Sequence, residues 1–233
     1  MELDELSSDS TISYSSEAQN EIPLFFETSD ITYIPKVEEL KPKITNIVSS
    51  INLGCNLNLK NIALKLKNAE FNSNKISTII LKSKDIKVTS TIFSNGKMIC
   101  SGAKNEKESK LACKKFSKIV KKMGYNVELR DFRIQNIVAS YDIKFKISLL
   151  DLYNKLNFMI NNSKNFGNNN NYCKFNKELF PTLIFYINES KISLLFFESG
   201  KVVLYGAKNI KEIEDIFKKM YPYLIESKIE KQI

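Results

Sequence analysis

Amide, hydroxyl and branched apolar side chains alternate along several extended stretches of this sequence. Asn46 and Val48 are two residues apart, and so are Asn136 and Val138. Residues i and i+2 of a strand share one face of a sheet, so each pair sets an amide beside an apolar group. The same spacing recurs in two further pairs, Ile99 with Ser101 and Val203 with Tyr205. Such a face is too apolar to leave in water and too polar to be core, so we expect function there.

Catalytic and metal chemistry find little support in the sequence. Histidine is absent, which removes the usual general base and the Ser-His and Cys-His nucleophile pairs. The four cysteines are widely and irregularly spaced, without a C-x-x-C pair: Cys55, Cys100, Cys113 and Cys173. We interpret them as reduced thiols of an intracellular protein and not as zinc ligands. No P-loop, G-x-S-x-G or G-x-G-x-x-G motif is present. We therefore expect a binding protein without cofactor or metal, and not an enzyme.

The chain contains one unit twice. Phe93–Lys104 returns as Phe197–Lys208 with six of twelve positions identical, and Ile44–Val48 returns as Ile134–Val138. Both segments recur in the same order, so we interpret the chain as a duplicated domain. We assign residues 43–131 to the first repeat and residues 132–233 to the second. Two copies of one unit predict a pseudo-symmetric surface for a pseudo-symmetric partner.

Charge is unevenly distributed along the chain. Residues 1–35 contain eight acidic residues and no Lys or Arg, whereas the remainder has 35 basic and 18 acidic residues, a net charge of +17. We predict an acidic, disordered tail over residues 1–42 and a basic folded region. The positive charge favours a polyanion such as a nucleic acid, although a lysine-rich solvated surface is the alternative. The sequence predicts no membrane span and no signal peptide.

Both repeats are predicted to share one order of elements. Strands are expected at 45–51, 76–81, 87–93 and 97–102, and again at 132–141, 182–187, 191–197 and 202–205. Helices are expected at 59–66, 106–122, 149–159 and 210–224. Gly96 and Gly200 supply the positive φ of two hairpin turns. An Asn-rich segment at about 161–171 has no counterpart in the first repeat and is expected to be a loop insertion. With the helices on one sheet face, the other face stays open.

Five segments identify a family when taken together and in order. They are Asn46–Cys55, Asn68–Asn72, Ile92–Met98, Glu178–Pro181 and Ser199–Leu204. From about Ile44 to Leu224 the chain resembles the TATA-box-binding protein family. The resemblance implies an α+β fold in which two pseudo-symmetric repeats form one curved antiparallel sheet, a saddle with helices on its convex face. It also implies binding astride the minor groove of A·T-rich DNA, which is a known property of the family and not a deduction from these residues.

The resemblance implies that eight residues meet the groove floor or bond its bases: Asn46, Val48, Ile99, Ser101, Asn136, Val138, Val203 and Tyr205. The apolar members would exclude the exocyclic amine of guanine. Asn46 and Asn136 would donate side-chain N–H groups to adenine N3 and thymine O2. Tyr205 replaces a threonine of the family, and we expect it to shift the preferred site.

Members of this family insert two phenylalanines per repeat between base steps and so kink the duplex. Phe93, Phe180 and Phe197 match three of these wedges. Ile76 stands at the fourth position, where its smaller side chain predicts a looser kink. Phosphate contacts are expected from six lysines: Lys75, Lys82, Lys87, Lys97, Lys191 and Lys201.

The convex face is expected to bind proteins. The resemblance implies contacts with transcription factors IIA and IIB and with TATA-binding-protein-associated factors, involving Lys110 and Lys114 of the helix 106–122 and Glu178. It further implies location in the nucleus. Whether two molecules form a homodimer in the absence of DNA is left open by the sequence. The predicted function is a general transcription factor that recognises and bends TATA-like promoter DNA and nucleates the preinitiation complex. The alternatives are a diverged paralogue with relaxed site preference, favoured by Ile76 and Tyr205, and a protein-interaction module that does not bind DNA.

Overall fold

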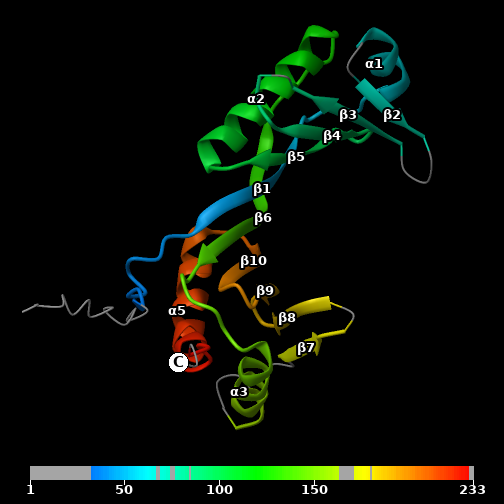
Figure 1. Ribbon diagram of the computed structural model, residues 1–233. Helices are drawn as coiled ribbons and strands as arrows, with labels where there is room; N and C mark the ends of the chain where they lie inside the picture. The colour runs from blue at the N-terminus through cyan, green and yellow to red at the C-terminus, as the bar shows by residue number, and fades with distance from the viewer. Residues whose placement is uncertain are drawn as a thin grey trace, which may run out of the picture. The chain divides into compact units, whose positions relative to one another are not determined.

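The computed structural model describes residues 33–66, 69–73, 77–83, 85–162, 171–178 and 180–230. The strands are β1 (Lys43–Asn52), β2 (Ala69–Asn72), β3 (Thr78–Lys82), β4 (Thr89–Phe93), β5 (Lys97–Ala103), β6 (Arg130–Asp142), β7 (Tyr172–Asn176), β8 (Phe180–Ile187), β9 (Ile192–Phe196) and β10 (Lys201–Ala207). They form one antiparallel sheet of ten strands in the order β2-β3-β4-β5-β1-β6-β10-β9-β8-β7 (Figure 1). The first strand of each repeat, β1 or β6, therefore lies at the centre, and the two repeats extend outward from this pair.

The described helices are α1 (Leu59–Lys65), α2 (Glu106–Lys122), α3 (Leu149–Asn162) and α5 (Ile210–Glu226). Asn58 caps α1, because its side chain accepts a hydrogen bond from the Asn61 amide. Asn105 and Asn209 cap α2 and α5 in the same way. The duplicated helices thus begin at equivalent asparagines, as a repeated unit requires.

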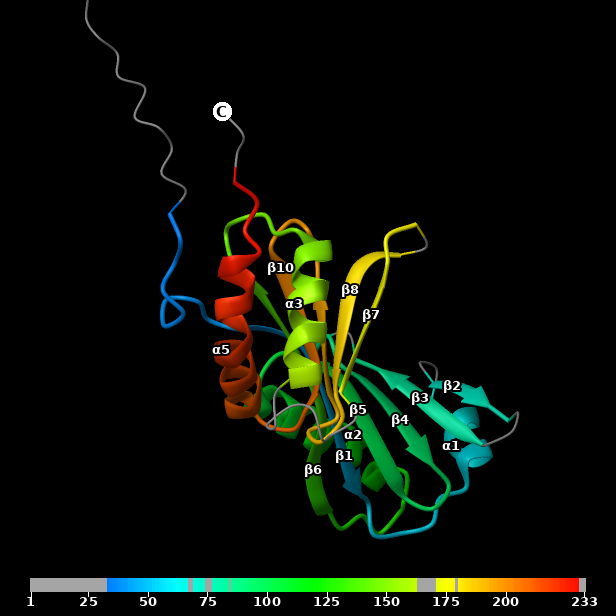
Figure 2. The same cartoon turned by 90° about the horizontal axis from the view of Figure 1, so that it is seen from below.

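The helices of both repeats cover the same face of the sheet. Ile47 of β1 pairs with Ile137 of β6, and both side chains are almost fully buried. On this face the Ser109 hydroxyl of α2 donates to the Ser49 hydroxyl over 2.7 Å. Also on this face, Tyr141 of β6 stacks on Phe217 of α5 with ring centroids 3.6 Å apart. Figure 2 shows α3 and α5 on one side of the strands of the second repeat.

The predicted fold class is confirmed: the protein is α+β, with one antiparallel sheet and its helices on one face. Two strands were not predicted, namely the edge strands β2 and β7. Both are short, and their side chains alternate between half-exposed and exposed, so neither carries the apolar signal of a buried strand.

Several element boundaries also differ from the predictions. α3 continues to Asn162, so the helix includes the start of the segment predicted as a loop insertion. α5 continues through Pro222 to Glu226. Residues 33–42, which we assigned to the tail, include the buried Pro35, whose carbonyl accepts a hydrogen bond from the Tyr221 hydroxyl. Most of the predicted tail and insertion, residues 1–32 and 163–170, lie outside the described residues.

The four cysteines are free thiols in the structure, and Cys100 and Cys113 are buried. Across the described residues, no helix is long and apolar enough to cross a membrane.

Candidate nucleic-acid interface

The face opposite the helices, called the open face below, carries all eight residues predicted to meet a groove. Strand register brings them together: Val48 lies opposite both Ser101 and Asn136, and Val138 lies opposite both Asn46 and Tyr205. Ile99 and Val203 occupy the same face two residues from Ser101 and Tyr205. All eight side chains are half-buried, whereas their neighbours in sequence on the helix face are buried. The open face is therefore continuous across both repeats.

The two central asparagines are held by matching hydrogen bonds. The Asn46 Oδ1 accepts from the Gly102 amide over 2.7 Å, and the Asn136 Oδ1 accepts from the Gly206 amide over 2.7 Å. Because a backbone amide can only donate, these bonds require the carbonyl end of each side chain to face the protein. The NH2 end of each amide is then the part left to donate on the open face.

Glycine is required where these bonds form. Gly102 and Gly206 have φ values of +116° and +106°, a region that side-chain-bearing residues avoid. A Cβ atom would lie 2.4 Å from the Lys87 carbonyl oxygen at Gly102 and 2.2 Å from the Lys191 carbonyl oxygen at Gly206. Each glycine thus allows a neighbouring stretch of backbone to approach closely. Its amide at the same time donates to Asn46 or Asn136.

A bulge in each central strand adds two cations that the sequence analysis did not select. The pairing of β1 with β6 skips Thr45, so Lys43 lies opposite Ser140 on the open face. It also skips Gln135, so Arg133 lies opposite Ser50 on the same face. Strict alternation would have assigned Lys43 to the helix face. The duplication could have pointed to these two cations, because each directly precedes one of the matching isoleucines, Ile44 and Ile134.

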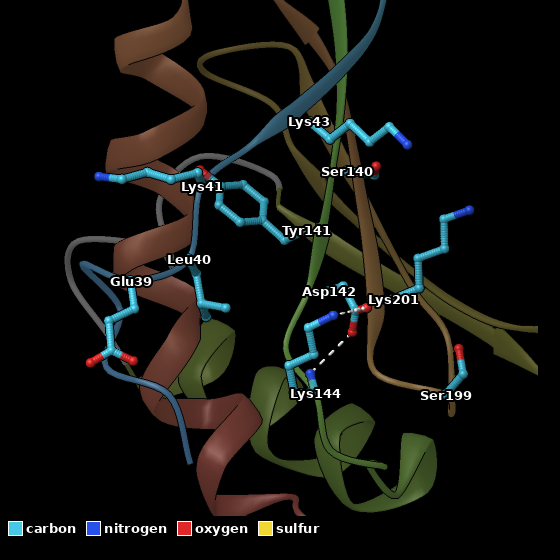
Figure 3. A pocket seen from close by; sticks show the side chains of 10 residues that line it. All are labelled: Glu39, Leu40, Lys41, Lys43, Ser140, Tyr141, Asp142, Lys144, Ser199 and Lys201. Atoms are coloured by element: carbon cyan, nitrogen blue, oxygen red, sulfur yellow. Dashed lines mark hydrogen bonds and ion pairs between the residues drawn. The ribbon is translucent and has the colours of Figure 1, made fainter. Parts of the chain in front are cut away.

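Lysines surround a pocket at the second-repeat edge of the central strands. The pocket has a volume of about 600 Å³. It is lined by Glu39, Leu40, Lys41, Lys43, Ser140, Tyr141, Asp142, Lys144, Ser199 and Lys201. Figure 3 shows the side chains of Lys43 and Lys201 extending toward the same side, while Lys144 forms an ion pair with Asp142 over 2.6 Å. Lys97 and Arg133 occupy the equivalent positions on the other side of the central strands, so each of the two cation pairs combines one residue from each repeat.

Two of the four predicted wedges are described with their side chains. Phe93 ends β4 opposite Thr78 and is half-buried. Phe197 follows β9, is half-buried, and frames the hairpin through hydrogen bonds with Lys201 and Gly200. Phe180 begins β8 opposite Asn176, and Ile76 lies outside the described residues. Phe93 and Phe197 therefore occupy equivalent ends of the two repeats on the open face.

The described lysines among those predicted to contact phosphates are spread around the edge of the open face. Lys87, Lys97, Lys191 and Lys201 are exposed, and Lys75 lies outside the described residues. Lys82 forms an ion pair with Glu70 over 2.6 Å, so a phosphate would have to compete for it.

The predicted partner-binding residues lie away from the open face or at its edge. Lys110 and Lys114 are exposed on α2, and Lys110 pairs with Glu106 over 2.6 Å. Glu178 is exposed in the turn between β7 and β8.

Comparison with known proteins gives a consistent result. A sequence profile described as "Transcription factor TFIID (or TATA-binding protein, TBP)" matches residues 41–123 and 131–227. The chain is 41% identical over 218 residues to the TATA-box-binding protein of Acanthamoeba castellanii, covering 94% of this chain and 80% of that protein. It is 41% identical over 197 residues to the protein of the same name from Acetabularia peniculus, covering 84% and 96%.

The solved structure of Methanococcus jannaschii TBP matches with a TM-score of 0.63 and 28% identity, covering 80% of this chain and 99% of that one. Two tandem repeats that share one sheet with an open, half-apolar face define a duplicated binding protein. The chain belongs to the TATA-binding protein family of transcription factors.

Proposed function

We propose that this protein is a general transcription factor that binds and bends A·T-rich promoter DNA through the minor groove. The pair of fixed asparagine amides is the observation that carries the proposal. Each presents its NH2 end beside Val48 or Val138 at the centre of the open face. The minor groove of A·T pairs offers only acceptors, adenine N3 and thymine O2, which these donors match. Family membership supports a DNA-binding factor and not an enzyme.

Selectivity for A·T pairs follows from what surrounds the asparagines. A guanine adds an N2 amine that projects into the minor groove. Apolar side chains such as Val48, Val138 and Ile99 cannot accept a hydrogen bond from that amine, so a G·C pair would leave a donor unsatisfied. Such a loss costs about 1–3 kcal/mol. The near-symmetric acceptor pattern of the groove also suits a duplicated reader.

The experiment that tests this function compares three duplexes of one length. Their central sites are A·T, G·C, or I·C, in which inosine lacks the guanine amine but keeps the major-groove pattern of guanine. We expect the A·T and I·C duplexes to bind alike and the G·C duplex to bind at least about tenfold more weakly. Equal affinity for all three would leave the protein-interaction module as the better explanation.

Phe93 and Phe197 are proposed to unstack the base steps at the two ends of the site, together with Phe180 and Ile76. Unstacking costs a few kcal/mol per step, which the larger contact area on bent DNA offsets. Phe197→Ala is expected to weaken binding about tenfold and to reduce bending, measured by energy transfer between dyes on the two DNA ends. Phe197→Leu is the matched control, because it keeps an apolar wedge and should retain most of the bend. A bend unchanged in the alanine variant would argue against the wedge.

The rim cations are proposed to neutralise phosphates. They include the six predicted lysines together with Lys43 and Arg133. We expect log K to fall with log salt concentration with a slope of about −3 to −6, since each neutralised phosphate contributes about −0.9. Removing Lys43 and Lys201 together should make the slope shallower by about 1–2. Lys118→Ala on α2 is the control and should leave the slope unchanged. An affinity independent of salt would contradict phosphate contact altogether.

Protein partners are proposed for the helix side of the molecule. Transcription factors IIA and IIB and the associated factors would dock there and at the turn of Glu178, with Lys110 and Lys114 offering exposed charge on α2. We propose that the protein acts in the nucleus, that residues 43–131 and 132–233 are its two repeats, and that it pairs with a second copy when DNA is absent.

A further inference from the structure

Three tyrosines form a lateral row across the open face of the second repeat. Tyr172 of β7 lies opposite Tyr186 of β8, and Tyr186 lies opposite Ser193 of β9. Tyr205 of β10 lies opposite Ser193 from the other side. Tyr172, Tyr186 and Tyr205, called the tyrosine row below, therefore lie in one line across the strands β7 to β10, with Ser193 of β9 between the last two.

The phenols of the row contact one another. The rings of Tyr172 and Tyr186 stack with centroids 4.5 Å apart and an interplanar angle of 20°. Burial, together with the neighbouring phenols of Tyr205 and Tyr172, raises the pKa of Tyr186. Ser193, between them, is only 6% exposed although it belongs to the open face. The Lys174 ammonium lies 5.4 Å and 5.8 Å from the ring centroids of Tyr172 and Tyr186.

The first repeat has a different surface at the equivalent place. There Lys82 lies opposite Thr89, and Thr89 lies opposite Ser101. Lys82 stands where Tyr186 does and Ser101 where Tyr205 does, as the matching register of the two repeats requires. The sheet therefore carries small hydroxyls and a cation in one half and a layer of phenols in the other.

Phenol side chains change which base pairs the open face can bind in the minor groove. A tyrosine hydroxyl donates one hydrogen bond and also accepts, whereas a valine or isoleucine methyl does neither. Tyr186 and Tyr205 flank the same serine, so two phenol oxygens with lone pairs that can accept from a base lie close together on the open face. The only donor that the minor groove offers is the guanine N2 amine.

We propose that the tyrosine row accepts a G·C pair in the half of the DNA site that faces the second repeat, so that the protein selects asymmetric sites and binds them in one direction. The proposal rests on the proposed minor-groove function and concerns the same surface. The first repeat offers Ser101 in place of Tyr205, and its short side chain keeps the hydroxyl close to the sheet, whereas the phenol oxygen lies at the end of a long ring. The first repeat therefore continues to require A·T pairs.

A palindromic A·T duplex is used to compare the two halves of the DNA site, one of which faces each repeat. Dissociation constants are measured for this duplex and for two series, one with a single G·C pair moved through one half and one with the same pair placed in both halves. In the single series the protein can always turn its second repeat toward the G·C pair. At one position, therefore, a single pair should change the dissociation constant less than about threefold, whereas two pairs should weaken binding at least about tenfold.

Two variants test whether the hydroxyls are responsible. Tyr186→Phe combined with Tyr205→Phe keeps the rings and removes both hydroxyls, so a single G·C pair should weaken binding at least about tenfold at every position. Replacing guanine by inosine should then restore binding by this variant. In the reverse design, Lys82→Tyr with Ser101→Tyr gives the first repeat a tyrosine pair, and two G·C pairs should become tolerated.

The results distinguish this proposal from the proposed function. If single G·C pairs weaken the parent and the double-phenylalanine variant equally, the tyrosine row does not read guanine, although a preference for A·T would still stand. If the parent binds the A·T palindrome no better than a fully G·C duplex, the minor-groove function itself is wrong. Circular dichroism confirms that each variant is folded before binding is compared.

Discussion

Asn136→Asp is expected to weaken binding to an A·T-rich duplex at least about 100-fold while leaving the protein folded. The carboxylate can still accept the 2.7 Å hydrogen bond from the Gly206 amide, so the internal contact survives. The NH2 donor, however, becomes a negatively charged oxygen that faces adenine N3 and thymine O2, which are both acceptors. A 100-fold loss corresponds to about 2.7 kcal/mol, within the cost of leaving charged polar groups unpaired. Fluorescence anisotropy with a labelled duplex measures the loss.

The same substitution elsewhere in the chain provides the control. Asn105→Asp changes the net charge identically, but its side chain caps α2 by accepting from the Glu108 amide, a role that aspartate performs equally well. Its affinity for DNA should change less than about threefold. Asn46→Asp, at the equivalent position in the first repeat, should behave like Asn136→Asp. Equal losses of affinity for Asn136→Asp and Asn105→Asp would show that the effect is general charge repulsion.

The central part of the open face was predictable because it depends on a short period. Side chains alternate along a strand, so Asn46 and Val48 share a face whatever the partner strand does. The duplication then supplied the equivalent pair, Asn136 and Val138. The hydrogen bonds that orient the amides were not predictable, because they join residues 56 and 70 positions apart in the chain.

The bulges and the strand register were beyond the sequence analysis for a physical reason. A single extra residue, Thr45 or Gln135, inverts the alternation and moves Lys43 and Arg133 to the open face. Nothing in the local composition marks either residue as a bulge. The tyrosine row likewise needs the pairing of β7 with β8, and β7 was not predicted at all. Only the register reveals that Tyr186 and Tyr205 lie opposite the same serine, Ser193.

Gly206→Ala is expected to destabilise the protein by more than about 3 kcal/mol and to lower its melting temperature by roughly 6–12 °C. The new Cβ would lie 2.2 Å from the Lys191 carbonyl oxygen, a contact that requires the backbone to move. Lys191 itself has a φ of +56°, so its own backbone is in a restricted conformation and has little freedom to shift. Any shift also withdraws the amide that holds Asn136. Urea unfolding followed by circular dichroism measures the change in the free energy of unfolding.

Gly124→Ala separates the steric clash from the cost of positive φ. Gly124 has a φ of +95°, close to the +106° of Gly206, but a Cβ there meets nothing within 4 Å. Its substitution should therefore cost only about 1–2 kcal/mol, the penalty of the backbone conformation alone. Gly102→Ala, with a contact of 2.4 Å to the Lys87 carbonyl oxygen, should resemble Gly206→Ala. If all three variants lose the same stability, the steric clash with the neighbouring backbone does not add to the destabilisation. Glycine would then be required at these positions only because of its positive φ.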